Sequence, residues 1–202
     1  MASSTNTAAT TPVPYGYQAG GYQTRPWTEP VPSTWNSTAS AVCNLNANTV
    51  GWFLVIANGF GFAIPAGATI DGIVIDVECS GGSGKTYDSE VVAVKGGVVG
   101  STSRASATVW SGGSHTWLGH GTGQNDLWGT TWTPAQINAA DFGVAVSPKS
   151  VGGTDIAEIH NVRITVYYTP TSIKTINGLT KSSVKTWNGL AMSSVKSING
   201  LT

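Results

Sequence analysis

Apolar side chains recur at every second position in several segments of this 202-residue chain, and that spacing decides its fold class. The clearest segments are 60–64, 73–77, 142–146 and 162–168. Alternate side chains of an extended strand point to opposite faces, so one face meets a core and the other meets water or a partner. Turns rich in Gly, Ser and Asn separate the segments. The pattern predicts an all-β fold, a jelly-roll-like antiparallel β-sandwich over residues 26–170.

One short helical signal interrupts these strands. Thr133, Pro134 and Gln136 supply an N-cap, a proline at the first helical position and a capping-box glutamine. We expect a single helical turn here and no helical layer.

The first 25 residues are rich in Ser, Thr, Ala, Gly, Pro and Tyr and carry a single charge, Arg25. Such a composition does not build a core, so residues 1–25 are predicted to be an extended N-terminal arm. Aromatic groups dominate contact energetics, and Tyr15, Tyr17 and Tyr22 are therefore candidate contacts with a neighbouring protein. A tail without a partner is the alternative.

The last 32 residues, 171–202, repeat with an 11-residue period, as SIKTINGL, SVKTWNGL and SVKSINGL. Asn-Gly between alternating residues is a strong hairpin signal, because both residues tolerate positive φ. Three such hairpins cannot form a core alone. We expect them to join copies of the chain into a homo-oligomer, with a trimer favoured; packing on their own sandwich is the alternative. The candidate self-association residues are Ile173, Ile176, Val184, Trp187, Val195 and Ile198.

Charge is unevenly distributed although the total is neutral. Residues 1–170 carry six basic and ten acidic side chains, a balance of −4, whereas residues 171–202 carry four lysines and no acid. A basic tail predicts salt-sensitive docking on an acidic surface such as a neighbouring copy; lysines that protect strand edges from aggregation are the alternative. The neutral total offers no basic excess for nucleic acid, and no apolar run is long enough to span a membrane.

The chain shows no secretory signal, so we expect it to fold in a reducing cytoplasm. Cys43 and Cys79 do not make a disulfide framework in a chain of this length. Cys79 continues the alternating apolar set and is expected to be a buried, unreactive thiol.

Three patterns suggest chemistry, and each has a simpler interpretation. The GGSGKT stretch at 81–86 lacks the glycine and the following helix of a phosphate-binding loop, and is predicted to be a hairpin loop. His115 and His120 are too loosely spaced to specify a metal site, and no nucleophile elbow supports a hydrolase. Four carboxylates could hold Ca²⁺ or act as a glycosidase pair, but a solvated face is favoured: Asp76, Glu78, Asp88 and Glu90. We therefore expect no catalytic residue, cofactor or metal.

Four tryptophans lie close together in the sequence, at positions 110, 117, 128 and 132. Exposed indoles stack on sugar rings, whereas buried ones supply core area. Two or three are expected in the core, and Trp117 and Trp128 are the candidates for glycan stacking.

Three runs resemble a β-sandwich domain of tailed-bacteriophage virion and prophage proteins: FGFAIPAGATIDGIVIDVE, DLWGTTWTPAQINAADFGVAVS and HNVRITVYYTP. The terminal repeats are similar to short C-terminal repeats of such proteins, and together the matches cover residues 60–202. The resemblance implies a non-enzymatic virion component, a capsid decoration or head-fibre protein that binds other virion proteins such as the major capsid protein and assembles in the bacterial host cytoplasm. A tail appendage or adhesin that binds host glycans is the alternative.

Overall fold

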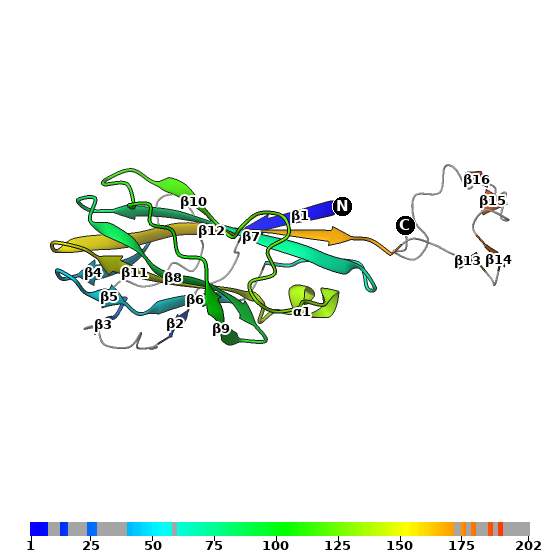
Figure 1. Ribbon diagram of the computed structural model, residues 1–202, viewed down its shortest axis with the longest axis horizontal. Coiled ribbons are helices and arrows are strands. Elements are labelled where there is room, and N and C mark those ends of the chain that lie inside the picture. Colours follow the sequence, from blue (N-terminus) through cyan, green and yellow to red (C-terminus); the bar gives the residue numbers. More distant parts are fainter. Residues whose placement is uncertain are drawn as a thin grey trace.

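The computed structural model describes residues 1–7, 13–15, 24–27, 40–57, 60–171, 175–176, 179–180, 186–187 and 190–191. Within these ranges two β-sheets lie against each other, one drawn above the other in Figure 1. Among the described strands every pair is antiparallel except β3 with β5. The predicted all-β, sandwich-like architecture is therefore confirmed.

Sheet I is built around its two longest strands, β7 and β12, which pair along most of their length. β10 pairs with the other side of β7, while β4 and β1 pair with successive parts of the other side of β12. The strands are β1 (Ala2–Thr7), β4 (Ala41–Leu45), β7 (Thr69–Gly81), β10 (Thr116–His120) and β12 (Asp155–Thr169).

Sheet II is built around β11, which pairs with β8 on one side and with β6 and β5 on the other. β9 extends the sheet beyond β8, and β2 and β3 extend it beyond β6 and β5. The strands are β2 (Val13–Tyr15), β3 (Thr24–Arg25), β5 (Val50–Gly51), β6 (Phe53–Ala57), β8 (Thr86–Lys95), β9 (Val98–Ser103) and β11 (Gly143–Ser150).

From β4 to β12 the chain passes repeatedly from one sheet to the other, and the connections collect at two ends. At the loop end, the β4–β5, β7–β8, β9–β10 and β11–β12 connections touch: Gly152 donates to Asn48, and Gly113 donates to the carbonyl of Gly81. At the terminal end, Ala2 lies opposite Tyr168. The first residues of β1 and the last residues of β12 therefore lie side by side at this end of the sandwich.

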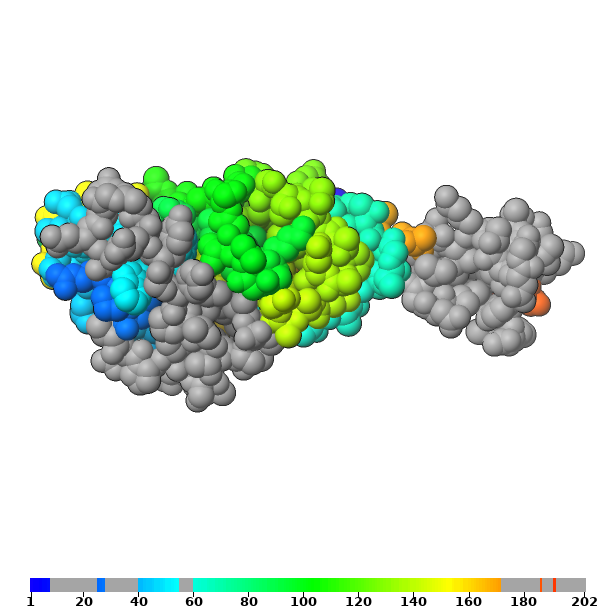
Figure 2. Space-filling view, turned by 90° about the horizontal axis from the view of Figure 1, so that it is seen from below, coloured from blue at the N-terminus to red at the C-terminus, as the bar shows by residue number. Residues whose placement is uncertain are grey.

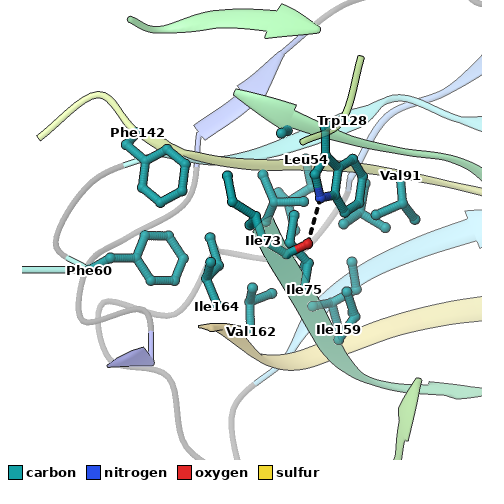
Figure 3. Packing of buried hydrophobic residues seen from close by; sticks show 14 of the residues in the cluster. Leu54, Phe60, Ile73, Ile75, Val91, Trp128, Phe142, Ile159, Val162 and Ile164 are labelled. Atoms are coloured by element: carbon teal, nitrogen blue, oxygen red, sulfur yellow. Dashed lines mark hydrogen bonds between the residues drawn. The ribbon is translucent and has the colours of Figure 1, made fainter. Parts of the chain in front are cut away.

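The core fills the space between the sheets. Ile73, Ile75 and Ile164 from sheet I meet Leu54 and Val91 from sheet II, and all five are 0% exposed. Figure 3 shows this packing, with the aromatic rings of Phe60 and Phe142 closing one end. The alternation in 73–77 and 162–168 therefore places apolar groups in the core, as predicted.

Two local predictions have different outcomes. Helix α1 (Pro134–Asn138) begins with the predicted capping box, in which Thr133 and Gln136 bond each other reciprocally. Residues 60–64, predicted to be a strand, alternate between buried and exposed but join no sheet. At the end of this segment the Asn138 side-chain amide bonds both the N–H and the C=O of Ile64, so that residue has no backbone group left for a neighbouring strand.

The predicted arm joins the sandwich wherever the structure describes it. β1 pairs with β12 over residues 2–7, and Thr5 bonds Thr165 through their hydroxyls at 2.9 Å. Small Ser and Thr side chains suit an edge strand that is held through its backbone and needs no core of its own. Tyr15 lies in β2 opposite Phe53, whereas Tyr17 and Tyr22 fall outside the described residues.

The first two repeats contain short paired strands, β13 (Thr175–Ile176) with β14 (Leu179–Thr180), and β15 (Thr186–Trp187) with β16 (Leu190–Ala191). Each pair flanks one Asn-Gly, which is the pairing that the hairpin signal predicts. Figure 1 draws these strands beyond the end of β12, away from both sheets. Ile176 and Trp187 lie in these strands; the other candidate self-association residues lie outside the described part: Ile173, Val184, Val195 and Ile198.

Candidate functional site

The outward surface of sheet I, which we call the Trp117 face, carries charged, polar and aromatic side chains. Residues paired across strands share a face, so Trp117 of β10, Glu78 of β7 and Asn161 of β12 form one row, and Asp76 and Arg163 form the next. Their strand neighbours, such as Val77 and Val162, are buried in the core. The face consists of Val74, Asp76, Glu78, Trp117, Glu158, Asn161, Arg163, Thr165 and Tyr167.

Trp117 is the one sequence-predicted glycan residue that the structure places at the surface, with 40% of its area exposed. The Arg163 guanidinium lies 4.6 Å from its ring centroid, and Arg163 Nε also donates to Asp76 Oδ2 at 3.1 Å. The cation covers one face of the indole. Trp117 therefore offers an exposed aromatic contact surface that lies next to the Arg163–Asp76 ion pair.

Trp128 does not serve as a glycan-stacking residue, because it is 4% exposed. Its indole N–H donates to the carbonyl of Ile73 at 2.9 Å, drawn as the dashed line in Figure 3. Trp110 and Trp132 are also buried, so three of the four clustered tryptophans belong to the core. The sequence prediction of two or three core tryptophans is confirmed, and the assignment of Trp128 to glycan stacking is wrong.

Trp128 has φ of 55°, an unfavourable backbone conformation for a bulky residue, and Asp126 holds it there. Asp126 accepts hydrogen bonds from the N–H groups of Trp128 and Thr122, both at 2.8 Å. Arg104 donates two hydrogen bonds of 2.7 and 3.0 Å to the same carboxylate. The Arg104 bonds hold the pKa of Asp126 well below its ordinary value. The pair therefore fixes the turn that places the Trp128 indole in the core.

The glycine-rich loop at 81–86 binds a carboxylate of its own chain. Ser83 and Lys85 donate their backbone N–H groups to Asp155 at 2.7 Å each, and the Thr86 hydroxyl adds a third bond. Burial raises the pKa of Asp155, but these bonds and one from the N–H of Ile156 outweigh it and lower the pKa overall. The groups that a phosphate would need are thus already occupied. The loop connects sheet I to sheet II, so the predicted hairpin is wrong.

Acid should selectively remove the stabilisation that Asp126 and Asp155 provide. Both pKa values are lower in the folded protein, so this stabilisation is complete above the unfolded value near pH 4 and is lost as the pH falls further. We expect Asp155→Asn to lower the melting temperature at pH 7 and to flatten its decline toward pH 2. Parallel melting curves for variant and wild type across that range would contradict the assignment.

The four carboxylates considered for Ca²⁺ do not converge. Asp76 and Glu78 lie on the outer side of sheet I, whereas Asp88 and Glu90 belong to β8 of sheet II. Asp88 is 1% exposed and accepts bonds from the Trp110 indole and from the N–H of Ser106. In the part of the chain that the structure describes, no three His, Cys, Asp or Glu side chains come together to hold a metal.

The histidines separate into two clusters that the sequence did not reveal. His120 is buried, with Nε2 2.9 Å from Asp88 Oδ2. The His115 ring stacks on His160, with centroids 3.5 Å apart. His160 lies at a β-bulge of β12, and burial, followed by the neighbouring His115, lowers its pKa.

Ser80, His160 and Glu158 meet, but not in the order of a hydrolase triad. The Ser80 hydroxyl donates to Glu158 at 2.8 Å and lies 3.0 Å from His160 Nε2. In a triad the carboxylate would orient the histidine through its second nitrogen, yet His160 Nδ1 has no hydrogen-bond partner among the described residues. Ser80 is also 1% exposed. The cluster therefore lacks both the geometry and the access of a nucleophile.

A groove of about 440 Å³ runs between β9 and residues 128–132. Figure 2 shows this side, where the green surface of β9 adjoins the yellow-green surface that follows residue 128. Trp132 lines the groove, but the Lys95 ammonium lies 5.4 Å from its ring centroid and Phe142 packs against it edge-on. The groove therefore presents hydroxyls and backbone rather than an open ring for stacking.

Both cysteines are free and fully buried. Burial raises the pKa of the Cys43 thiol to about 12, and burial with the nearby carboxylates of Asp88 and Glu78 raises that of Cys79 further. Thiolates are the reactive species, so the predicted unreactive character of Cys79 agrees with its surroundings.

No helix in the described ranges has the length and apolar character needed to cross a membrane. The chain matches no protein-family model, no curated protein and no solved structure. The functional proposal below therefore rests on the sequence and the geometry.

Proposed function

We propose that this chain is a non-enzymatic structural protein of a bacteriophage virion, with a jelly-roll body that is displayed on the particle. The observation that carries the proposal is the strand order. Sheet I runs β4–β12–β7–β10 and sheet II runs β5 and β6–β11–β8–β9, and from β4 to β12 the chain crosses between the sheets at every connection except β5–β6 and β8–β9. This order supports a jelly roll, in which two Greek keys interlock, an architecture that is frequent in viral capsid and lectin domains.

The arrangement of the two ends supports attachment at one end and display at the other. The first residues of β1 lie beside the end of β12, from which the chain continues into the repeats, so both can contact a particle surface at this end. With the terminal end attached in this way, the loop end of the sandwich points away from the particle. We propose that the repeats join copies into a homo-oligomer, that the body meets the major capsid protein or another virion protein, and that assembly takes place in the host cytoplasm.

The test is rebinding. Particles produced without this chain, mixed with purified full-length protein, should take it up to a saturating, symmetry-related number of copies, measured after density-gradient purification. Particles that leave the protein at the top of the gradient would contradict the proposal.

Glycan recognition by the Trp117 face is a second candidate, favoured by the exposed indole of Trp117 beside hydrogen-bonding side chains. If it holds, a glycan array probed with wild-type protein gives a defined signal that Trp117→Ala reduces by about tenfold or more, equivalent to the loss of one stacking contact of about 1.4 kcal/mol. An array without signal removes this candidate.

A further inference from the structure

We propose that the Trp117 face receives the repeat segment, residues 171–202, of a second copy of this chain. The inference rests on the proposed assembly through the repeats and identifies the surface that they bind.

Charge is the first reason. The face carries the carboxylates of Asp76, Glu78 and Glu158 against one guanidinium, that of Arg163, a balance of −2. Arg163 is paired with Asp76, so Glu78 has no cationic partner among the described residues. Glu158 lies 3.8 Å from His160, but burial lowers the pKa of that ring and leaves it neutral at pH 7. Two carboxylates therefore remain for an incoming cation.

The repeats carry the complementary charges. Lys174, Lys185 and Lys196 recur at the same position of the three copies, Lys181 adds a fourth cation, and no acid is present. Opposite charges arranged in this way guide association and fix its register.

Apolar contact is the second reason. Trp117 is 40% exposed beside Glu78, and Val74 and Tyr167 continue the face as half-buried groups. Each repeat places apolar residues on both sides of its lysine, including Trp187 in the second copy. The face and the repeats both alternate apolar and charged groups. When they come together, the apolar groups can be buried while the opposite charges pair.

The direction of the chain favours a second copy over the same one. Glu78 lies opposite Asn161, eight residues before the end of β12, which corresponds to about 26 Å along the strand. Figure 1 draws β13–β16 beyond that end of β12 and away from the sheets. The described strands of the repeats therefore do not lie on the face of their own copy, which favours the face of a second copy as their binding surface.

Zero-length cross-linking tests the contact directly. Full-length chains labelled with light and heavy nitrogen are mixed, treated with a carbodiimide and analysed by mass spectrometry. We expect Glu78 and Glu158 joined to repeat lysines in peptide pairs of mixed label. Lysines joined to acids elsewhere, such as Glu90 and Asp141, or pairs of a single label only, would overturn the inference.

A charge swap separates this inference from the proposed function. Glu78→Lys with Glu158→Gln should raise the dissociation constant of the oligomer by about tenfold or more, and Lys174→Glu, Lys185→Glu and Lys196→Glu in the same chain should restore it. The matched control, Asp141→Lys with Glu90→Gln, makes the same change in net charge away from the face and should have little effect. An oligomer unchanged by the face variant overturns the inference alone; a monomeric wild type overturns the proposed assembly as well.

Discussion

Removal of residues 171–202 is expected to convert the oligomer into a folded monomer. The buried apolar residues that the structure describes all lie between Trp27 and Val166, so none of the described core residues is removed by this deletion. The repeats supply the apolar and basic groups proposed to join copies. Sedimentation equilibrium should therefore give the monomer mass, while far-ultraviolet circular dichroism keeps its β-sheet signal.

Deletion of the last copy alone, residues 194–202, provides the graded control, because two copies then remain to make contacts. It should weaken the oligomer without abolishing it. A truncated chain that keeps the wild-type mass would show that the body assembles by itself, and one that fails to fold would show that the repeats belong to the core.

Arg104→Ala is expected to cost about 3–5 kcal/mol of unfolding free energy, because it leaves the Asp126 carboxylate buried and without its cation. The side chain of Asp126 is 2% exposed. Arg163→Ala breaks a pair of the same chemistry, Arg163 with Asp76, whose side chains are 42% and 20% exposed. That loss should cost about 0–1 kcal/mol.

Urea unfolding of both variants at one fixed protein concentration makes this comparison, since association also contributes to apparent stability. Arg104→Lys keeps the charge but not the paired bonds and should fall between Arg104→Ala and wild type. If Arg104→Ala and Arg163→Ala lost the same unfolding free energy, the buried Arg104–Asp126 pair would contribute no more to stability than the exposed Arg163–Asp76 pair, which would contradict the prediction.

The elements encoded by neighbouring residues could be predicted from the sequence. The alternation around Ile75 and Ile164 reflects one strand at a time, and the capping box at Thr133 and Gln136 spans a single turn. The Asn-Gly hairpins likewise depend on adjacent residues. Such features need no information about which strand lies next to which.

The features that depend on which strands pair with each other could not be predicted from the sequence. β7 and β8 follow each other in the sequence and look like a hairpin, but they pair in different sheets, which separates Asp76 from Asp88. The Arg104–Asp126 pair joins two glycine-rich connections. In a chain with only 10% charged residues, each such charge is a candidate for a buried pair, yet no spacing rule identifies its partner.

The polar strand β1 shows that amino-acid composition alone does not reveal whether a segment belongs to the sandwich. Its Ser and Thr residues indicated a segment outside the fold, because they bury little area. An edge strand is held by its backbone ladder, however, and its side-chain pattern carries little of that signal.

The most direct test of the central proposal is the copy number of this chain in purified phage particles, determined by quantitative mass spectrometry against the major capsid protein. We predict a fixed number per particle: hundreds for a head decoration protein, and a handful for a fibre or tail appendage. Particles that form normally and contain none of the chain would contradict a structural role in the virion.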